Sequence, residues 1–307
     1  MSLRKLQHFI MVAEHKNLSY AAKQLNIVQP ALSQSIKRLE KELGVLLFSR
    51  SRKGMELTTE GENFLQHAYG ITNQYQQAKE SLLAHNENPE GTVSIAITGS
   101  AARVLLKPVT HELVKNYPKI QMNIETGLAK NIQDGFNAGD YDLVITHLEQ
   151  TGSNINVVPL IQEDLFYATK YTDSTPNQGV SIEDLFELPL ILPRRRHGVA
   201  PVLQSLKDSY RSKIKIAQVR GGLVTTLQLI EWGFGASLLP WSSIYKLVEQ
   251  KKISARRIKE SDFVHIVSIV SPANRPIAPA TKVVMDLVST AAREAHENNH
   301  WLGKLLI

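Results

Sequence analysis

Amide, hydroxyl and basic side chains follow one another at helical spacing around Pro30. The set comprises Gln29, Ser33, Gln34, Lys37 and Arg38. Amides and hydroxyls hydrogen bond to base edges, whereas Lys and Arg bind phosphates, and this stretch contains no acidic residue before Glu40. The chemistry that these residue types support at this spacing is recognition of DNA.

A helix from Pro30 to Gly44 would position these side chains. Pro30 suits the first helical position, where a missing N–H costs nothing, and Gly44 suits the left-handed residue that ends a helix. The opposite face is a single apolar stripe. It consists of Leu32, Ile36, Leu39 and Leu43.

A shorter helix is predicted directly upstream. Ser19 is the expected N-cap, Ala21 and Ala22 form a face small enough for a close helix crossing, and Asn26 suits the turn that follows. The apolar residues of the three-residue loop 26–28 are expected to tuck between the helices. The pair is therefore predicted to be a helix-turn-helix, whose second helix lies in the DNA major groove.

The same pattern is typical of a small helical domain whose outer face is only hydrated, but two features favour DNA. Residues 45–58, VLLFSRSRKGMELT, predict two short strands around a basic tip with Arg50, Arg52 and Lys53. Residues 1–60 hold ten Lys and Arg against five Asp and Glu, which is +5 of the chain's net +6. A basic patch confined to a winged helix is typical of DNA binding.

At this point the sequence resembles a known family. QPALSQSIKRLEKELGVLLFSR followed by LTTEG is similar to the N-terminal signature of the LysR-type bacterial transcriptional regulators. The resemblance is close across residues 1–65 and looser through the rest of the chain. It implies double-stranded promoter DNA, a small-molecule effector and RNA polymerase as partners, and a homotetramer built as a dimer of dimers.

Within the predicted winged helix, the residues divide by role. The N-terminal half of a recognition helix meets base edges, which assigns that contact to Gln29, Pro30, Ser33 and Gln34. Four basic residues are expected mostly to meet phosphates, namely Lys37, Arg38, Arg50 and Arg52.

One long helix is predicted from Thr58 to about residue 88, with a capping box at Thr59 and Glu62. Apolar residues then alternate gaps of four and three, which is a heptad seam suited to pairing with a second helix. The seam predicts dimerisation through Phe64, Ile71, Tyr75 and Leu82. The alternative is a helix packed on its own domain, whereas the resemblance implies a dimer's linker helix.

The chain changes to alternating strands and helices after the polar segment 85–91. This order predicts α/β architecture, and the resemblance implies two lobes similar to a type 2 periplasmic binding protein. The predicted boundaries are 1–58 for the winged helix-turn-helix, 59–90 for the linker helix and 91–307 for the effector-binding domain. Within the last, the first lobe covers about 91–162 and 268–307, and the second about 163–267.

Ligands in such folds bind between lobes, near strand C-terminal ends and helix N-termini. A strand is predicted to end and a helix to begin at Thr98, Gly99 and Ser100, where free N–H groups and a hydroxyl can hold an anion. An ordinary N-cap is the alternative. Gly127 and His147 end the next two strands, although a histidine at a strand end is commonly only hydrated.

The run Pro193–Gly198 contains three consecutive arginines, which are usually exposed. Because the run matches the family's loop over the cleft, the resemblance implies that one of Arg194, Arg196 and His197 points inward. Thr225 opens a further helix toward this region. The effector is accordingly expected to be a small organic anion.

Enzymatic interpretations are weak. The sequence HENNH at 296–300 matches a zinc-protease pattern, but its two asparagines suit a helix interior poorly and no downstream third ligand follows. We therefore predict no catalytic residues, no metal and no cofactor. The alternative function is an enzymatic or solute-binding α/β domain tethered to DNA.

Composition agrees with a regulator inside the cell. The chain has no cysteine, which excludes disulfides and thiolate metal sites, and no run approaches the ~18 apolar residues of a membrane span. We expect no signal peptide, no membrane partner and a cytoplasmic location.

Overall fold

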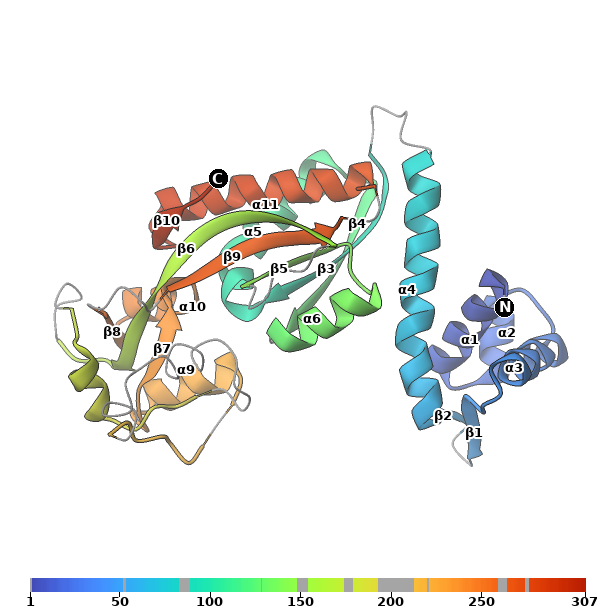
Figure 1. Ribbon diagram of the computed structural model, residues 1–307, viewed down its shortest axis with the longest axis horizontal. Coiled ribbons are helices and arrows are strands. Elements are labelled where there is room, and N and C mark those ends of the chain that lie inside the picture. The colour runs from blue at the N-terminus through green and yellow to red at the C-terminus, as the bar shows by residue number, and fades with distance from the viewer. Residues whose placement is uncertain are drawn as a thin grey trace. The chain divides into compact units, whose positions relative to one another are not determined.

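The computed structural model describes residues 2–51, 54–82, 89–127, 129–147, 154–173, 179–192, 213–219, 221–258, 264–273 and 276–307. The chain separates into two compact units, one of Met1–Asn86 with Asp134–Asp142 and one of Glu87–Gln133 with Leu143–Ile307. Figure 1 labels the elements of both. No helix in the described part of the chain is long and apolar enough to cross a membrane.

The first unit contains a three-helix cluster, a β-hairpin and a long helix. These are α1 (Leu3–His15), α2 (Leu18–Gln24), α3 (Gln29–Leu43), β1 (Phe48–Ser51), β2 (Gly54–Leu57) and α4 (Thr59–Leu82). Phe9 of α1 is fully buried, and its ring centroid lies 5.3 Å from that of Phe48 and 5.2 Å from that of Phe64. One aromatic cluster therefore joins α1, the wing and α4.

The helix-turn-helix has the predicted order, with different caps. The N-cap of α2 is Asn17, whose side chain accepts a hydrogen bond from the Tyr20 N–H at 3.0 Å, so the prediction of Ser19 was wrong. Asn26 takes the predicted left-handed conformation, with φ 53°. Ile27 packs on the core, but Val28 is 69% exposed and does not tuck between the helices.

Thr58 caps the N-terminus of helix α4. The Thr58 hydroxyl accepts a hydrogen bond from the Gly61 N–H at 3.0 Å, so Thr58 is the capping residue rather than Thr59. The same hydroxyl donates to the carbonyl of Leu46 at 2.7 Å, which ties the start of α4 to the segment before the wing.

The second unit is an α/β structure. Its elements in chain order are β3 (Gly91–Thr98), α5 (Gly99–Asn116), β4 (Ile120–Gly127), α6 (Ala129–Ala138), β5 (Leu143–His147), β6 (Ile155–Lys170), a 3-10 helix (Ile182–Phe186), α9 (Leu223–Glu231), β7 (Ser237–Pro240), α10 (Trp241–Glu249), β8 (Ile253–Arg257), β9 (Val264–Pro272), α11 (Pro279–Glu297) and β10 (Gly303–Leu305). The division between the two units falls within α6, before Asp134.

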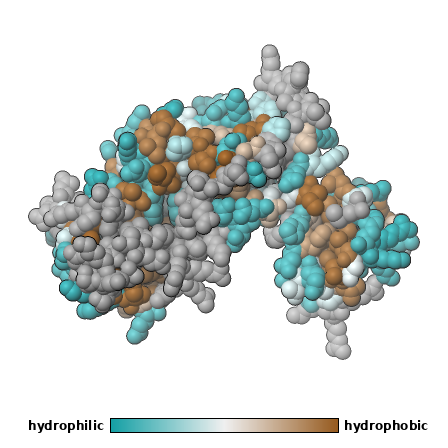
Figure 2. Space-filling view, in the orientation of Figure 1, coloured by the Kyte–Doolittle hydropathy of each residue, from teal (hydrophilic) through white to brown (hydrophobic). Residues whose placement is uncertain are grey.

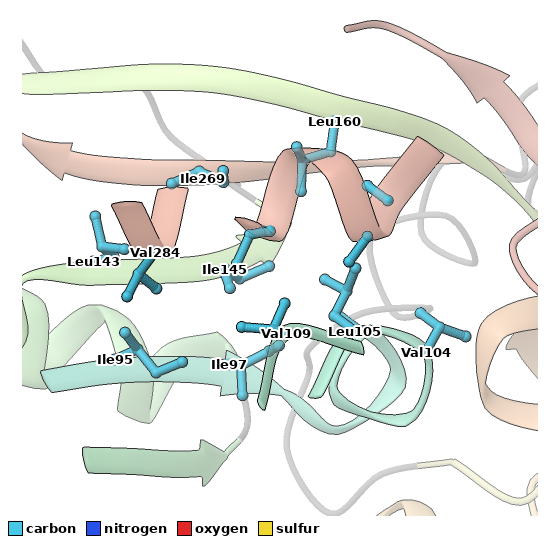
Figure 3. Close-up of a cluster of buried hydrophobic side chains, with 14 of the residues drawn as sticks. Ile95, Ile97, Val104, Leu105, Val109, Leu143, Ile145, Leu160, Ile269 and Val284 are labelled. Atoms are coloured by element: carbon cyan, nitrogen blue, oxygen red, sulfur yellow. The ribbon is translucent and has the colours of Figure 1, made fainter. Parts of the chain in front are cut away.

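The strands follow the order β10-β6-β9-β5-β3-β4. Strand β3 pairs in parallel with both β4 and β5, whereas β9 runs antiparallel to β5 and β6. We call the part built on β3, β4, β5, α5 and α11 the first lobe. Its core is shown in Figure 3, where side chains of β3, β5, α5 and α11 meet.

Strand β6 continues out of this sheet into a second, smaller group of strands, formed by β7 and β8. We call the part built on β7, β8 and α9 the second lobe (Figure 1). The alternating pattern in the sequence did not show that a single strand, β6, runs from Ile155 to Lys170. Strands β8 and β10 were likewise not predicted.

Candidate DNA-binding and effector sites

The polar face of α3 is available at the surface. Gln29, Pro30, Gln34, Lys37 and Arg38 are exposed and Ser33 is half-buried. The opposite face, carrying Leu32, Ile36 and Leu39, is fully packed in the core. Helix geometry thus presents the predicted set together, with Pro30 in the first turn and Gly44 left-handed at φ 73° beyond the last.

Two contacts from α1 hold α3 in place. The His8 ring Nδ1 and the Ser35 hydroxyl are 2.8 Å apart, and Lys5 forms an ion pair with Glu42. Burial, with a smaller contribution from Arg4, lowers the pKa of His8 below its ordinary value. His8 is therefore a neutral structural partner of the recognition helix.

Glu40 connects α3 to the wing, and the sequence analysis missed it. Its carboxylate oxygen Oε1 accepts hydrogen bonds from the backbone N–H groups of Leu47 at 2.9 Å and Phe48 at 3.2 Å. Phe48 is the first residue of β1. Because one side chain near the end of α3 fixes the first residue of the wing, α3 and the wing are positioned together.

The wing is the predicted antiparallel hairpin. Its register pairs Phe48 with Leu57 and Ser51 with Gly54. The backbone of Arg50 lies in β1 opposite Met55, while its side chain lies outside the described atoms. Arg52 and Lys53, at the predicted basic tip, lie outside the described residues.

The candidate effector site lies in the second unit, at the N-terminus of α5. Thr98 is its N-cap and is 5% exposed, and its hydroxyl makes no cap bond and has no hydrogen-bond partner among the described residues. Gly99 and Ser100, both half-buried, form the first turn. Burying a polar group without a hydrogen-bond partner costs free energy of folding. Because this hydroxyl is already desolvated, a hydrogen bond to a ligand would carry little further desolvation cost.

The N-terminus of α9 lies against the same place. A Cβ atom built on Gly99 would be 3.5 Å from Leu223 Cδ2, and Leu223 is the first residue of α9. Thr225 is exposed in that first turn. Two helices from different lobes therefore bring their N-terminal ends together, which concentrates positive partial charge and free N–H groups.

Strand ends border this position. β3, β4 and β5 are parallel, and Gly127 pairs with Thr98 at the end of β4. His147, half-buried at the end of β5, stacks on His265 of β9 with ring centroids 4.9 Å apart. The predicted arginine run with Arg194, Arg196 and His197 lies outside the described residues.

Comparison with known proteins identifies the two parts. A family model of the bacterial regulatory helix-turn-helix proteins of the lysR family matches residues 3–62, and one of the LysR substrate binding domain matches residues 86–293. The chain belongs to the LysR family of transcriptional regulators. The resemblance noted in the sequence and the fold class expected from it are confirmed.

Relatives of this LysR-family regulator are themselves regulators. It is 27% identical over 300 residues to the nitrogen assimilation regulatory protein nac of Klebsiella aerogenes, covering 97% of this chain and 98% of the relative. It is 34% identical over 193 residues to the transcriptional regulator AlsR of Bacillus subtilis, covering 62% and 64%.

A solved relative has been seen on DNA. Full-length CbnR in complex with its target DNA is 25% identical to this LysR-family chain, with a TM-score of 0.67 covering 95% of this chain and all (100%) of CbnR. That complex, together with the helix-turn-helix match, supports DNA as a partner of this regulator.

The residues of the predicted dimer seam on helix α4 differ in their surroundings. Phe64 and Ala68 pack on the core of the winged helix. Further along α4, Ile71 and Tyr75 are 39% and 55% exposed. Figure 2 shows apolar surface on this unit among hydrophilic side chains. The side chain of Leu82 lies outside the described atoms.

The two histidines of the segment HENNH in this regulator contact different partners. His296 Nδ1 lies 3.1 Å from the Trp301 carbonyl, and the His300 ring stacks on Tyr245 at 4.8 Å. No group of three metal-binding side chains is found in the described part of the chain.

Proposed function

We propose that this regulator is controlled by a small organic anion held between its two lobes. The observation that supports this most is Thr98, a buried hydroxyl with no hydrogen-bond partner among the described residues, at the N-terminus of α5 and close to the start of α9. A carboxylate there would accept hydrogen bonds from helix N–H groups and hydroxyls and would meet the positive ends of two helices.

Each predicted effector residue has a distinct part in this proposal. Thr98, Ser100 and Thr225 donate hydroxyl hydrogen bonds, while Gly99 and Gly127 allow the ligand to approach the backbone. His147 borders the site from β5. A cation from the run holding Arg194, Arg196 and His197 would neutralise the second end of the anion, because Arg binds carboxylates bidentately.

On the DNA side, we propose that Gln29, Pro30, Ser33 and Gln34 contact base edges. Lys37, Arg38, Arg50 and Arg52 contact phosphates, which adds affinity that is independent of sequence. Two winged helices are presented by a dimer formed through Ile71, Tyr75 and Leu82 of paired α4 helices. Two dimers then join through the α/β lobes into a tetramer that acts on cytoplasmic promoter DNA with RNA polymerase.

The effector changes the DNA-bound state only as far as it prefers one lobe arrangement over the other, which is typically about 1–3 kcal/mol. Sensing requires binding without turnover, so we propose that the protein is not an enzyme. Recovery of the unchanged acid after long incubation tests this, and a converted product would favour the tethered-enzyme alternative.

Calorimetry of the full-length protein with a panel of small mono- and dicarboxylic acids tests the anion site. Ser100→Ala and Thr98→Val should each weaken the best acid about tenfold, because each removes one hydrogen bond to a charged group. Ser289→Ala is the matched control, since that hydroxyl bonds to the Met285 carbonyl of its own helix, α11.

The neutral amide of the same acid separates charge from shape. It should bind at least tenfold more weakly than the acid if helix N-termini recognise the carboxylate. Equal binding of acid and amide, or unchanged affinity in both variants, would contradict the proposed site and leave the assignment to the LysR family intact.

A further inference from the structure

Glu163 lies where the crossing strand β6 leaves one lobe and enters the other. On the first-lobe side, β6 pairs with β9 as far as Asp164 and with β10 at Glu163. On the second-lobe side, its pairing with β7 begins at Leu165. Glu163 is nevertheless 1% exposed, so a carboxyl group is buried at the junction of the lobes.

Two donors from different segments hold this carboxyl. Its Oε2 accepts a hydrogen bond from the Trp301 indole N–H at 2.6 Å and another from the Ser242 hydroxyl at 3.1 Å. Ser242 is in the first turn of α10, and Trp301 lies between α11 and β10. Both partners are fully buried, and both donors are neutral.

Helix α10 packs on both lobes, so a contact at its start can affect how the lobes are held together. Its Tyr245 packs in the core of the first lobe, and its Ile244 packs in a core of the second. The Trp241 indole N–H at the start of α10 also donates to the Asn299 carbonyl at 2.8 Å. The start of α10 and the segment after α11 are thus joined directly by this hydrogen bond, and indirectly through the Glu163 carboxyl, which binds both Ser242 and Trp301.

The protonation of Glu163 is set by its surroundings. Burial raises its pKa to about 7, against smaller opposing contributions from Trp301 and Ser242, with Asp164 raising it further. Asp164 itself forms an ion pair with Arg257 of β8 at 2.7 Å. An unpaired buried charge is unfavourable, so the neutral form suits this closed arrangement.

Other titratable groups on the elements around Glu163 enter any pH dependence. His265 pairs with Glu163 across β9 and stacks on His147 of β5. On the C-terminal side, Lys304 of β10 is exposed, and His300 precedes Trp301. Variants of Glu163 alone are therefore needed to separate its titration from those of the histidines.

We propose that Glu163 is a positioning residue whose gain or loss of a proton changes how α10 and Trp301 hold the two lobes together. When the carboxyl ionises, its proton goes to solvent, and the remaining charge favours arrangements in which water reaches it. This requires β6 to separate locally from α10 or Trp301. The link to regulation rests on the proposed function, in which lobe arrangement controls DNA binding.

Fluorine NMR of the full-length protein carrying 5-fluorotryptophan tests the contact directly. The chain has three tryptophans, and the exposed Trp232 serves as the internal reference. The Trp301 resonance, assigned with Trp232→Phe and Trp241→Phe, should shift with a midpoint near pH 7. In Glu163→Gln, which keeps a neutral acceptor, it should stay at the low-pH position.

Operator affinity, measured without any effector between pH 6 and 8, tests the consequence. Because a one-unit difference in pKa between free and bound protein changes affinity about tenfold, we expect a change of roughly three- to tenfold in the parent. Between pH 6 and 8, the logarithm of the affinity of Glu163→Gln should change by less than about half as much as that of the parent. Glu249→Gln, at the exposed end of α10, is the control and should show the same change as the parent.

The proposal is overturned by a Trp301 resonance that does not titrate, or that titrates alike in parent and Glu163→Gln. It is equally overturned when parent and Glu163→Gln show the same pH dependence of operator affinity. Failure of every acid in the calorimetric panel would instead count against the anion effector, because neither of these two measurements contains an effector.

Discussion

Replacing Glu40 by alanine should detach the wing from the recognition helix. The substitution removes the acceptor of two backbone N–H bonds, at 2.9 and 3.2 Å, from Leu47 and Phe48. Leu47 is fully buried and Phe48 is 6% exposed, so water replaces these bonds poorly. With about 1.5–3 kcal/mol for each hydrogen bond to a charged group, partly offset by relaxation of the loop, we expect the unfolding free energy to fall by roughly 2–4 kcal/mol.

Urea unfolding of the full-length protein, followed by circular dichroism for the first transition, measures this loss. Glu40→Gln keeps an amide oxygen at the same place and should lose less than half as much. Lys41→Ala on the same helix is the exposed control and should leave the midpoint nearly unchanged. The reasoning is refuted when Glu40→Ala and Lys41→Ala unfold at the same urea concentration.

Three further predictions concern α4 and the buried carboxyl. Ile71→Glu should place like charges in the proposed α4 pair and halve the mass seen by analytical ultracentrifugation, and an unchanged mass would contradict the seam. Gly61→Ala should destabilise the first unit by roughly 1–3 kcal/mol in thermal unfolding, since the new Cβ would lie 2.1 Å from the Leu47 carbonyl oxygen, and a parent-like melting temperature would be inconsistent with that close approach. For Glu163, a folded pKa of about 7 above an ordinary value of 4.5 means that its stability contribution is full below pH 4.5 and is lost as pH rises through 7. The loss of unfolding free energy amounts to about 3 kcal/mol. Glu163→Gln should remove this part of the pH dependence of chemical unfolding. Parallel pH profiles for the parent and the variant would contradict the contribution of Glu163.

Local patterns in the sequence were sufficient for the DNA-binding part of the fold. The apolar stripe of α3 and its two end residues, Pro30 and Gly44, follow from helical periodicity and backbone conformation, which neighbouring residues determine. The caps of α2 and α4 were each misplaced because residues close together in the sequence, Asn17 and Ser19 or Thr58 and Thr59, can each cap a helix. Only the hydrogen bonds in the structure distinguish them.

Contacts between distant segments were not predictable in the same way. Glu40 has no motif that marks it as a partner of the wing, and Glu163 resembles any strand residue until β6, α10 and Trp301 are seen to meet. The heptad pattern of α4 also does not tell that Phe64 contacts Phe9 of the same domain. The residues proposed for the effector near Thr98 lie at a strand end and a helix start, which are local features that the sequence can predict. The sequence also predicted that the helix opened by Thr225 faces this region, whereas the contact between Gly99 and Leu223 is seen only in the structure.

The most direct test of the central claim is a competition footprint of the full-length regulator on its own promoter, against single-base variants of the protected site. If the N-terminal half of α3 reads base edges, Gln34→Ala should lose about 1–3 kcal/mol of discrimination at one position of each half-site. Lys37→Ala, one helical turn further on, should weaken all sites alike and lower the slope of affinity against salt. A Gln34→Ala protein that keeps the parent's preference at every position would contradict the proposed reading of DNA.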